Sequence, residues 1–367
     1  NSGFEYYDFM NHLRQELKVY TKIDGNFFWL DPFKNKEIIS NPKKLKNFFL
    51  NYNIKYLLIR PWIDYSDYDF EKGRRVSRAE LKDYFLKLKK TIKLIDPKIK
   101  LLVPLQSNII SLNKEVQKVI KENNVIKKGG FRYYNIDIKE FLLKSNLNLD
   151  KDELILNQKG EILFEIYWHD KKYGSKNIVE IALPLKAYPN GHLHNKLVNQ
   201  INFALDEIEY DGVYIDQFNQ YYISPKHKIS FNNQKPNMAK IDTNTGKIVS
   251  EYENVVLNTL DFEKKIIDYL NTKNALMVFN THHLHDKLRY KKVARFGEGF
   301  WYFYAAKLWK DENFEKFAPT QSFNASHLST PLSLSMPVHF YLKDDSEVST
   351  HDILVKNLKF CLFNGNL

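Results

Sequence analysis

The stretch from Tyr210 to Phe218, with the sequence Tyr-Asp-Gly-Val-Tyr-Ile-Asp-Gln-Phe, places the tightest constraint on the fold. Its apolar centre, Val213 to Ile215, predicts a short buried strand, and the Asp-Gly pair before it predicts a tight turn. Residues 194–208 carry apolar side chains at helical spacing. A helix, a turn, an apolar strand and then an acid form an active-site position in α/β barrels. Asp216 is therefore the first candidate catalytic residue; the alternative is that it only starts the following turn.

The same alternation of strands and helices recurs along the chain and predicts a parallel sheet. Strands are expected at 54–59, 99–105, 275–279 and 292–296, with helices at 41–51, 78–95, 113–123 and 255–271. We expect one (β/α)8 TIM-type barrel spanning 1–367. Residues 129–185 read as a β-rich elaboration, and the polar residues 226–253 are predicted to be a long loop at the carboxyl face.

Five predicted strands end in polar or aromatic residues, on the face where barrel enzymes place their sites. These endings are Arg60-Pro61-Trp62, Gln106-Ser107-Asn108, Asp216-Gln217, Asn280-Thr281-His282 and Gly297-Glu298. Candidate substrate-binding residues at or near them are Trp62, Asp64, Gln106, Trp168, Gln217, Asn280, His282, His283, Arg295 and Trp301. Tryptophans beside acids suit stacking of sugar rings, although any one of them can instead belong to the core.

Asp216 and Glu298 lie at the ends of predicted strands separated by one intervening strand. Glycoside cleavage needs two carboxyl groups, one as nucleophile or base and one as acid. Gly297 and Gly299 flank Glu298 and would let the backbone approach a ligand closely. The alternative for Glu298 is a loop carboxylate that balances Arg295.

The histidines support a rival hypothesis, a metal-dependent hydrolase. His282, His283, His285 and Asp286 crowd together, and His192 and His194 form a His-x-His pair. Helical metal pairs prefer i, i+4 spacing, and no second cluster in the sequence has clear ligand spacing. Dinucleotide, P-loop and Gly-x-Ser-x-Gly motifs are missing from the sequence, so we expect neither a cofactor nor a resident metal.

The composition limits the kinds of binding partner that we expect. The formal charge of +11 comes mostly from lysines spread along predicted helices, which indicates solvated faces rather than a nucleic-acid footprint. No apolar run approaches the roughly 18 residues of a membrane span. The lone Cys361 excludes an internal disulfide. The chain begins at Asn1-Ser2-Gly3, so a processed protein, secreted or at the cell surface after loss of a signal segment, is one expectation for its location.

The segment Asp211-Gly212-Val213-Tyr214-Ile215-Asp216 resembles the barrel glycosidases of the α-galactosidase and α-glucosidase superfamily. The resemblance covers about 190–300 and implies that Asp216 is the nucleophile of a retaining mechanism. Glu298 matches the acid/base position by place only, because that superfamily usually has Asp there; the endo-α-N-acetylgalactosaminidase group, a second relative, pairs Asp with Glu. The expected function is O-glycoside hydrolysis in an oligosaccharide, polysaccharide or glycoconjugate. A metal-dependent hydrolase and a barrel that binds glycans without cleaving them stay as alternatives.

Overall fold

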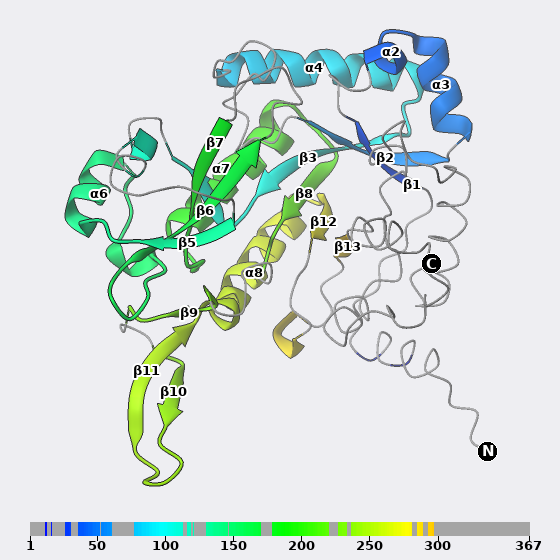
Figure 1. Cartoon of the computed structure of the whole chain (residues 1–367). Coiled ribbons are helices and arrows are strands. Elements are labelled where there is room, and N and C mark those ends of the chain that lie inside the picture. The colour runs from blue at the N-terminus through cyan, green and yellow to red at the C-terminus, as the bar shows by residue number, and fades with distance from the viewer. Residues whose placement is uncertain are drawn as a thin grey trace, which may run out of the picture.

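The computed structural model describes an α/β fold with one parallel and two antiparallel sheets. The described residues are 12, 16, 26–30, 36–51, 53–60, 77–112, 116–118, 120, 130–145, 147–169, 178–219, 227–232, 236–280, 285–288 and 293–296. Figure 1 shows the parallel sheet at the centre, with the antiparallel elements extending from one end of it.

Six strands form the parallel sheet, and their order in space is their order along the chain. They are β1 (Asn26–Leu30), β2 (Ile54–Ile59), β3 (Lys100–Gln106), β8 (Gly212–Asp216), β12 (Leu276–Asn280) and β13 (Ala294–Phe296). Each strand therefore joins the sheet beside its predecessor, as in a barrel. The predicted α/β class with a parallel sheet is confirmed. The described residues supply six strands of this sheet, so closure into an eight-stranded barrel stays a prediction.

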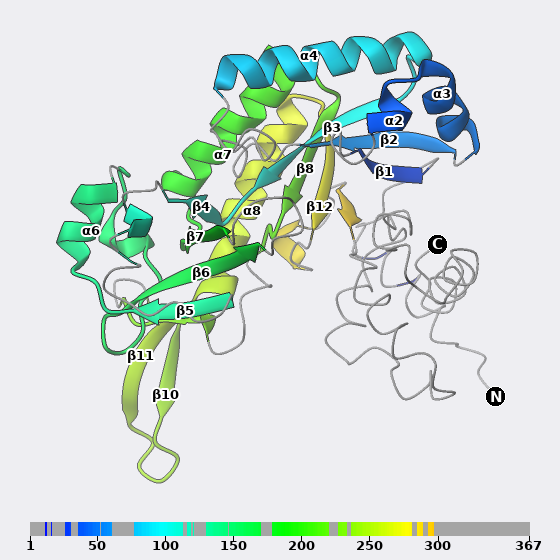
Figure 2. The same ribbon diagram turned by 45° about the horizontal axis from the view of Figure 1, so that its top comes forward.

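The helices pack on one face of this sheet, as Figures 1 and 2 show for α4, α7 and α8. The helices are α2 (Lys36–Ile39), α3 (Pro42–Asn51), α4 (Arg78–Ile95), α7 (His192–Asn202), which continues as the π-helix η3 (Phe203–Glu207), and α8 (Val255–Thr272). Ser77 and Glu80 form a capping box that starts α4 where the sequence predicts it. Strand residues alternate between this helix-covered core and a smaller cluster on the other face, formed by Phe27, Leu58, Leu102, Tyr214 and Val278.

The predicted β-rich elaboration is a four-stranded antiparallel sheet inserted between β3 and α7. Its strands, in spatial order, are β4 (Ile109–Ser111), β7 (Ile178–Pro184), β6 (Ile162–His169) and β5 (Gly130–Tyr134), with α6 (Ile138–Ser145) and the 3-10 helix η1 (Lys151–Glu153) between β5 and β6. A turn at 157–160 precedes β6, and Gly160 supplies its positive φ of 79°.

The prediction of a long loop at 226–253 is wrong for the described part of this range, where three strands form the second antiparallel sheet. It contains β9 (Ile229–Ser230), β10 (Met238–Ile241) and β11 (Ile248–Asn254), and β10 and β11 protrude as a hairpin (Figure 1). In the turn between them, the Asp242 carboxylate accepts a hydrogen bond from Asn244 N (2.8 Å) and Gly246 has a φ of 67°. A short 3-10 helix, η5 (Asp286–Leu288), lies between β12 and β13.

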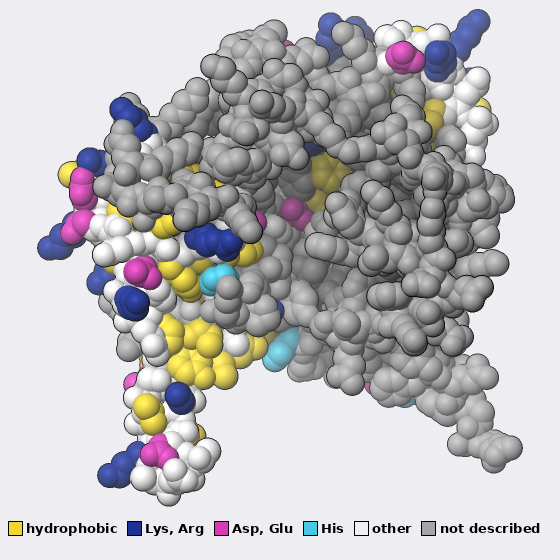
Figure 3. Space-filling view, in the orientation of Figure 1, with side chains coloured by type: hydrophobic (Ala, Val, Ile, Leu, Met, Phe, Trp, Pro, Cys, Tyr) yellow, Lys and Arg dark blue, Asp and Glu magenta, His cyan; other side chains and the backbone are white. Residues whose placement is uncertain are grey.

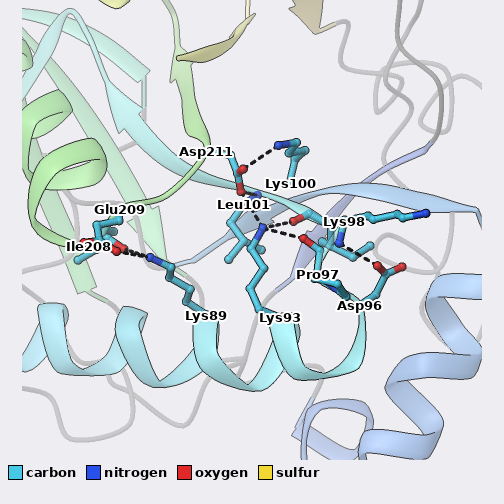
Figure 4. Close-up of polar contacts among 11 residues, drawn as sticks. Lys89, Lys93, Asp96, Pro97, Lys98, Lys100, Leu101, Ile208, Glu209 and Asp211 are labelled. Carbon is cyan, nitrogen blue, oxygen red and sulfur yellow. Dashed lines mark hydrogen bonds and ion pairs between the residues drawn. The ribbon is translucent and has the colours of Figure 1, made fainter. Parts of the chain in front are cut away.

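The start of β8 is fixed by Asp211 and Gly212. The Asp211 carboxylate accepts hydrogen bonds from Leu101 N (3.0 Å), Lys93 Nζ (3.1 Å) and Lys100 Nζ (3.0 Å), as Figure 4 shows. Burial acts to raise the pKa of Asp211, but these hydrogen bonds and the charge of Lys93 outweigh burial and lower it. A Cβ atom on Gly212 would lie 2.0 Å from the carbonyl oxygen of Leu276, so only glycine permits this approach of β8 to β12.

We expect Asp211→Asn to lower the free energy of unfolding at pH 7 by roughly 1–3 kcal/mol, because a charged acceptor between two lysines is lost. The lowered pKa of Asp211 makes its contribution complete above the ordinary Asp pKa of about 3.9. The contribution then declines as the pH falls toward the folded-state value. Urea denaturation should therefore show a gap between wild type and variant at pH 7 that narrows near pH 3. The exposed Lys264–Asp268 pair provides the control, since Asp268→Asn should cost less than about 0.5 kcal/mol.

Candidate active site

The strand register brings Asp216, Gln106 and Asn280 to one edge of the parallel sheet. Gln106 is the register partner of Asp216, and Asn280 follows the partner of Ile215 on the other neighbouring strand. Asn280 Nδ2 donates a 2.6 Å hydrogen bond to Asp216 Oδ1. Three residues that the sequence singled out as candidates therefore lie together at the carboxyl ends of three adjacent strands.

Tyr214 extends this cluster along the face of the sheet opposite the helices. Its hydroxyl donates to Asp216 Oδ1 at 3.4 Å, and its ring centroid lies 6.1 Å from that of Trp29. The Arg60 guanidinium lies over the Trp29 ring, 5.6 Å from its centroid. Trp29, Tyr214 and Arg60 were not among the predicted substrate-binding residues. The two-residue period of a strand could have identified Tyr214, because it puts Tyr214 on the same face as Asp216.

The backbone after Asp216 is clamped by two buried residues of the neighbouring chain segment. Ser107 Oγ donates to the carbonyl oxygens of Asp216 (2.8 Å) and Gln217 (3.0 Å), and Asn108 Nδ2 also bonds the Gln217 carbonyl. Ser107 and Asn108 are completely buried. Gln217 has a φ of 53°, a left-handed conformation that a residue with a side chain adopts only when its surroundings hold it there.

The side chains of Gln106 and Gln217 bond each other, with Gln106 Nε2 as donor and Gln217 Oε1 as acceptor. Both residues were predicted to bind substrate. Their contact also joins the ends of β3 and β8. Both residues remain beside Asp216, so a role in binding stays a prediction.

Several predicted site residues lie outside the described residues, namely Trp62, Asp64, His282, His283, Glu298 and Trp301. Trp168 is part of β6 in the antiparallel sheet and Arg295 is part of β13, but neither side chain is described. Glu298 follows the end of β13 by two residues, and β13 pairs with β12, the strand that carries Asn280. In the sequence, Glu298 therefore comes shortly after β13, the strand that pairs with the strand of Asn280.

No metal site is found within the described ranges, where no group of three or more His, Cys, Asp and Glu side chains could hold an ion. His282 and His283, half of the predicted histidine cluster, lie outside those ranges. His285 is exposed, and its Nδ1 accepts a hydrogen bond from Lys287 N at 3.1 Å.

The described surface shows no concentration of positive charge in the view of Figure 3, where Lys and Arg side chains are scattered. None of the described helices has the length and apolar character needed to cross a membrane.

Comparison with solved structures finds distant likenesses to carbohydrate-active enzymes. A maltogenic alpha-amylase, AmyB, from Thermotoga neapolitana has a TM-score of 0.38 and 11% identity over 84% of this chain and 56% of its own. A cycloisomaltooligosaccharide glucanotransferase from Paenibacillus sp., complexed with cycloisomaltoheptaose, has a TM-score of 0.37 and 10% identity over 75% of this chain and 34% of its own. An alpha-N-acetylgalactosaminidase, NagBb, from Bifidobacterium bifidum has a TM-score of 0.35 and 8% identity over 99% and 54%.

This chain thus matches between about a third and just over half of the length of these three structures. At such TM-scores the likeness assigns neither a family nor an activity. No family model and no curated protein matches the sequence.

We expect Ser107→Ala to lower the free energy of unfolding by roughly 0.5–1.5 kcal/mol, because it removes a hydroxyl donor from two partly buried carbonyls that keep Ser107 N and Asn108 Nδ2 as donors. Thermal or urea denaturation measures this loss. Ser40→Ala is the control, since its exposed hydroxyl bonds only the Glu37 carbonyl and its removal should be close to neutral. Equal stability of the two variants would show that the clamp does not hold the turn after Asp216.

Proposed function

We propose that this protein is a glycoside hydrolase whose nucleophile is Asp216. The observation that carries the proposal is the carboxylate of Asp216 at the carboxyl end of a central strand, held by two neutral donors, Asn280 Nδ2 and the Tyr214 hydroxyl. The amide and the phenol orient this carboxylate at the edge of the sheet. The partly exposed ring of Trp29, which lies on the same face beside the buried Tyr214 ring, provides a surface on which a sugar can stack.

In the proposed reaction a carboxylate oxygen of Asp216 attacks the anomeric carbon, while the glycosidic bond breaks and Glu298 protonates the departing oxygen. The resulting glycosyl ester is then hydrolysed by water, from which Glu298 takes a proton. The free sugar leaves, and both carboxyl groups return to their starting states. The retaining outcome follows from the resemblance of the segment around Asp216, and the reaction needs neither metal nor organic cofactor.

The assignment of Glu298 is part of this proposal. Both carboxyl groups must reach the same anomeric carbon, about 5 Å apart for retention and about 6.5–9.5 Å apart for inversion. The position of Glu298 just beyond β13, two strands from β8, supports such an arrangement when the parallel sheet curves. We include closure into a (β/α)8 barrel in the proposal because it supplies that curvature.

The proposal is tested by turnover of α- and β-linked aryl glycosides and of natural glycans by wild type, Asp216→Asn and Glu298→Gln. We expect both variants to lose at least about 1,000-fold in kcat/KM, since each removes a group required in the transition state. Aryl glycosides with good leaving groups should lose less in Glu298→Gln, because they need little protonation. Activity that survives Asp216→Asn would disprove the assignment, and loss of activity with EDTA alone would favour a metal-dependent hydrolase.

Asn280→Ala should lower kcat/KM by roughly 10- to 100-fold, because it removes a charge-assisted hydrogen bond worth about 1.5–3 kcal/mol. Asn280→Asp should be worse at neutral pH, since two carboxyl groups would then lie within hydrogen-bonding distance. Steady-state kinetics on the best aryl glycoside measures both effects. Asn51→Ala, an exposed change on α3, is the matched control and should leave kcat/KM unchanged. A loss confined to KM would place Asn280 on the substrate rather than on Asp216.

A further inference from the structure

A cavity lies beside the start of α7, and its lining does not include Asp216. It is an open cavity of about 1110 Å³ between the segment 148–153, the segment 188–192, one side of α7 and the end of β11. Asp216, Gln106 and Asn280 are not among the residues that line it. Its volume is at the upper end of the roughly 300–1,000 Å³ of ligand sites, which leaves room for more than one sugar ring.

The carboxylates in the floor of the cavity are already bound within the protein. Glu153 accepts hydrogen bonds from His192 N (2.6 Å) and Asp150 N (3.2 Å), so the first backbone N–H of α7 is also occupied. Glu253 is almost fully buried and is bound by Lys186 and by the Tyr188 hydroxyl at 3.2 Å. A cationic ligand would therefore meet one carboxylate paired with a lysine, Glu253, and one whose oxygens already accept backbone hydrogen bonds, Glu153.

The cationic side chain on α7 is likewise engaged. Lys196 Nζ donates to the carbonyl oxygens of Ile109 (2.7 Å) and Gln106 (3.4 Å). At the mouth of the cavity, Lys151 and Asp152 are adjacent in sequence and carry opposite charges. An anionic ligand thus gains little from the lysines of this cavity.

The walls are rich in side-chain amides, which come from Asn148, Asn190, Asn195, Asn199 and Gln200. Asn148 and Asn199 are exposed, and within the described part of the chain their side chains make no hydrogen bond. Each amide offers both a donor and an acceptor, the pairing that adjacent sugar hydroxyls require. Tyr188 and Pro189 add apolar surface to the same cavity.

From this combination we infer that the cavity is a second carbohydrate-binding site, which takes a neutral oligosaccharide through Asn148 and Asn199. The choice of a carbohydrate rests on the proposed function of Asp216, but binding at this cavity requires no catalysis. Lys196, which lines the cavity, bonds the Gln106 carbonyl at the end of β3, the strand next to β8.

The test is isothermal titration calorimetry of full-length Asp216→Asn protein with four neutral probes: maltohexaose, isomaltohexaose, cellohexaose and xylohexaose. We expect at least one probe to bind, with a Kd that does not change between 50 and 500 mM NaCl because the ligand is neutral. Adding Asn148→Ala and Asn199→Ala together should weaken that binding at least tenfold. Asn271→Ala, an exposed asparagine on α8, should leave the Kd unchanged.

Three results would overturn the inference: no binding of any neutral probe, binding unaffected by the double alanine change, or binding of hexagalacturonate alone. Turnover of a small aryl glycoside keeps the two proposals apart. The double alanine variant should retain wild-type turnover of such a substrate, which is too short to reach the cavity. Binding without turnover in the wild type would reject the proposed function and keep the second site. Turnover without binding would keep the proposed function and reject the second site.

Discussion

The close approach of β8 to β12 at Gly212 is the constraint on which the candidate active site depends. With no side chain at Gly212, β8 lies against the Leu276 carbonyl, while Asp211 holds the same end of β8 to β3 through Leu101 N. These contacts fix the register of β8 with both neighbours at the amino end of the strand. Because β8 is short and extended, the register at its start determines what lies beside Asp216 at its end.

Two aspartates five residues apart have different environments at the two ends of β8. Asp211 is surrounded by Lys93, Lys100 and a backbone N–H, which lower its pKa and stabilise it as an anion. Asp216, at the other end, accepts hydrogen bonds from the Asn280 amide and the Tyr214 hydroxyl, which orient its carboxylate. The amino end of β8 thus holds a carboxylate between lysines, and the carboxyl end holds one that an amide and a phenol orient.

The sequence predicted those features that local patterns determine. The apolar runs at 54–59 and 213–215 are strands, Ser77 starts a helix, and the residues that end three neighbouring strands lie together. The hairpin of β10 and β11 was missed because its strands are largely exposed, so no apolar period distinguishes them from a polar loop.

The clamp on Gln217 and the cavity beside α7 could not be predicted either. Ser107 meets Gln217 from 110 positions away, and Glu153 meets His192 N from 39 positions away. Such contacts depend on how segments that are distant in the sequence pack together, and no local sequence pattern predicts them.

The two inserted sheets form one structural unit, and this explains the buried ion pair between them. One insertion follows β3 and the other follows β8, and they are joined by hydrogen bonds from Leu156 N to Ser230 Oγ (3.1 Å) and from Phe231 N to the Leu156 carbonyl (2.9 Å). Lys186 and Glu253 add a charged pair at the same junction, with both side chains only 1% exposed. A buried pair contributes little net stability, but loss of one partner costs about 3–5 kcal/mol, so the pair strongly disfavours other arrangements of the two insertions. Its effect is to fix the end of β11, and hence the start of α8, against the segment that leads into α7. That fixed junction forms the floor of the cavity, so the amide side chains around it are presented by a rigid frame.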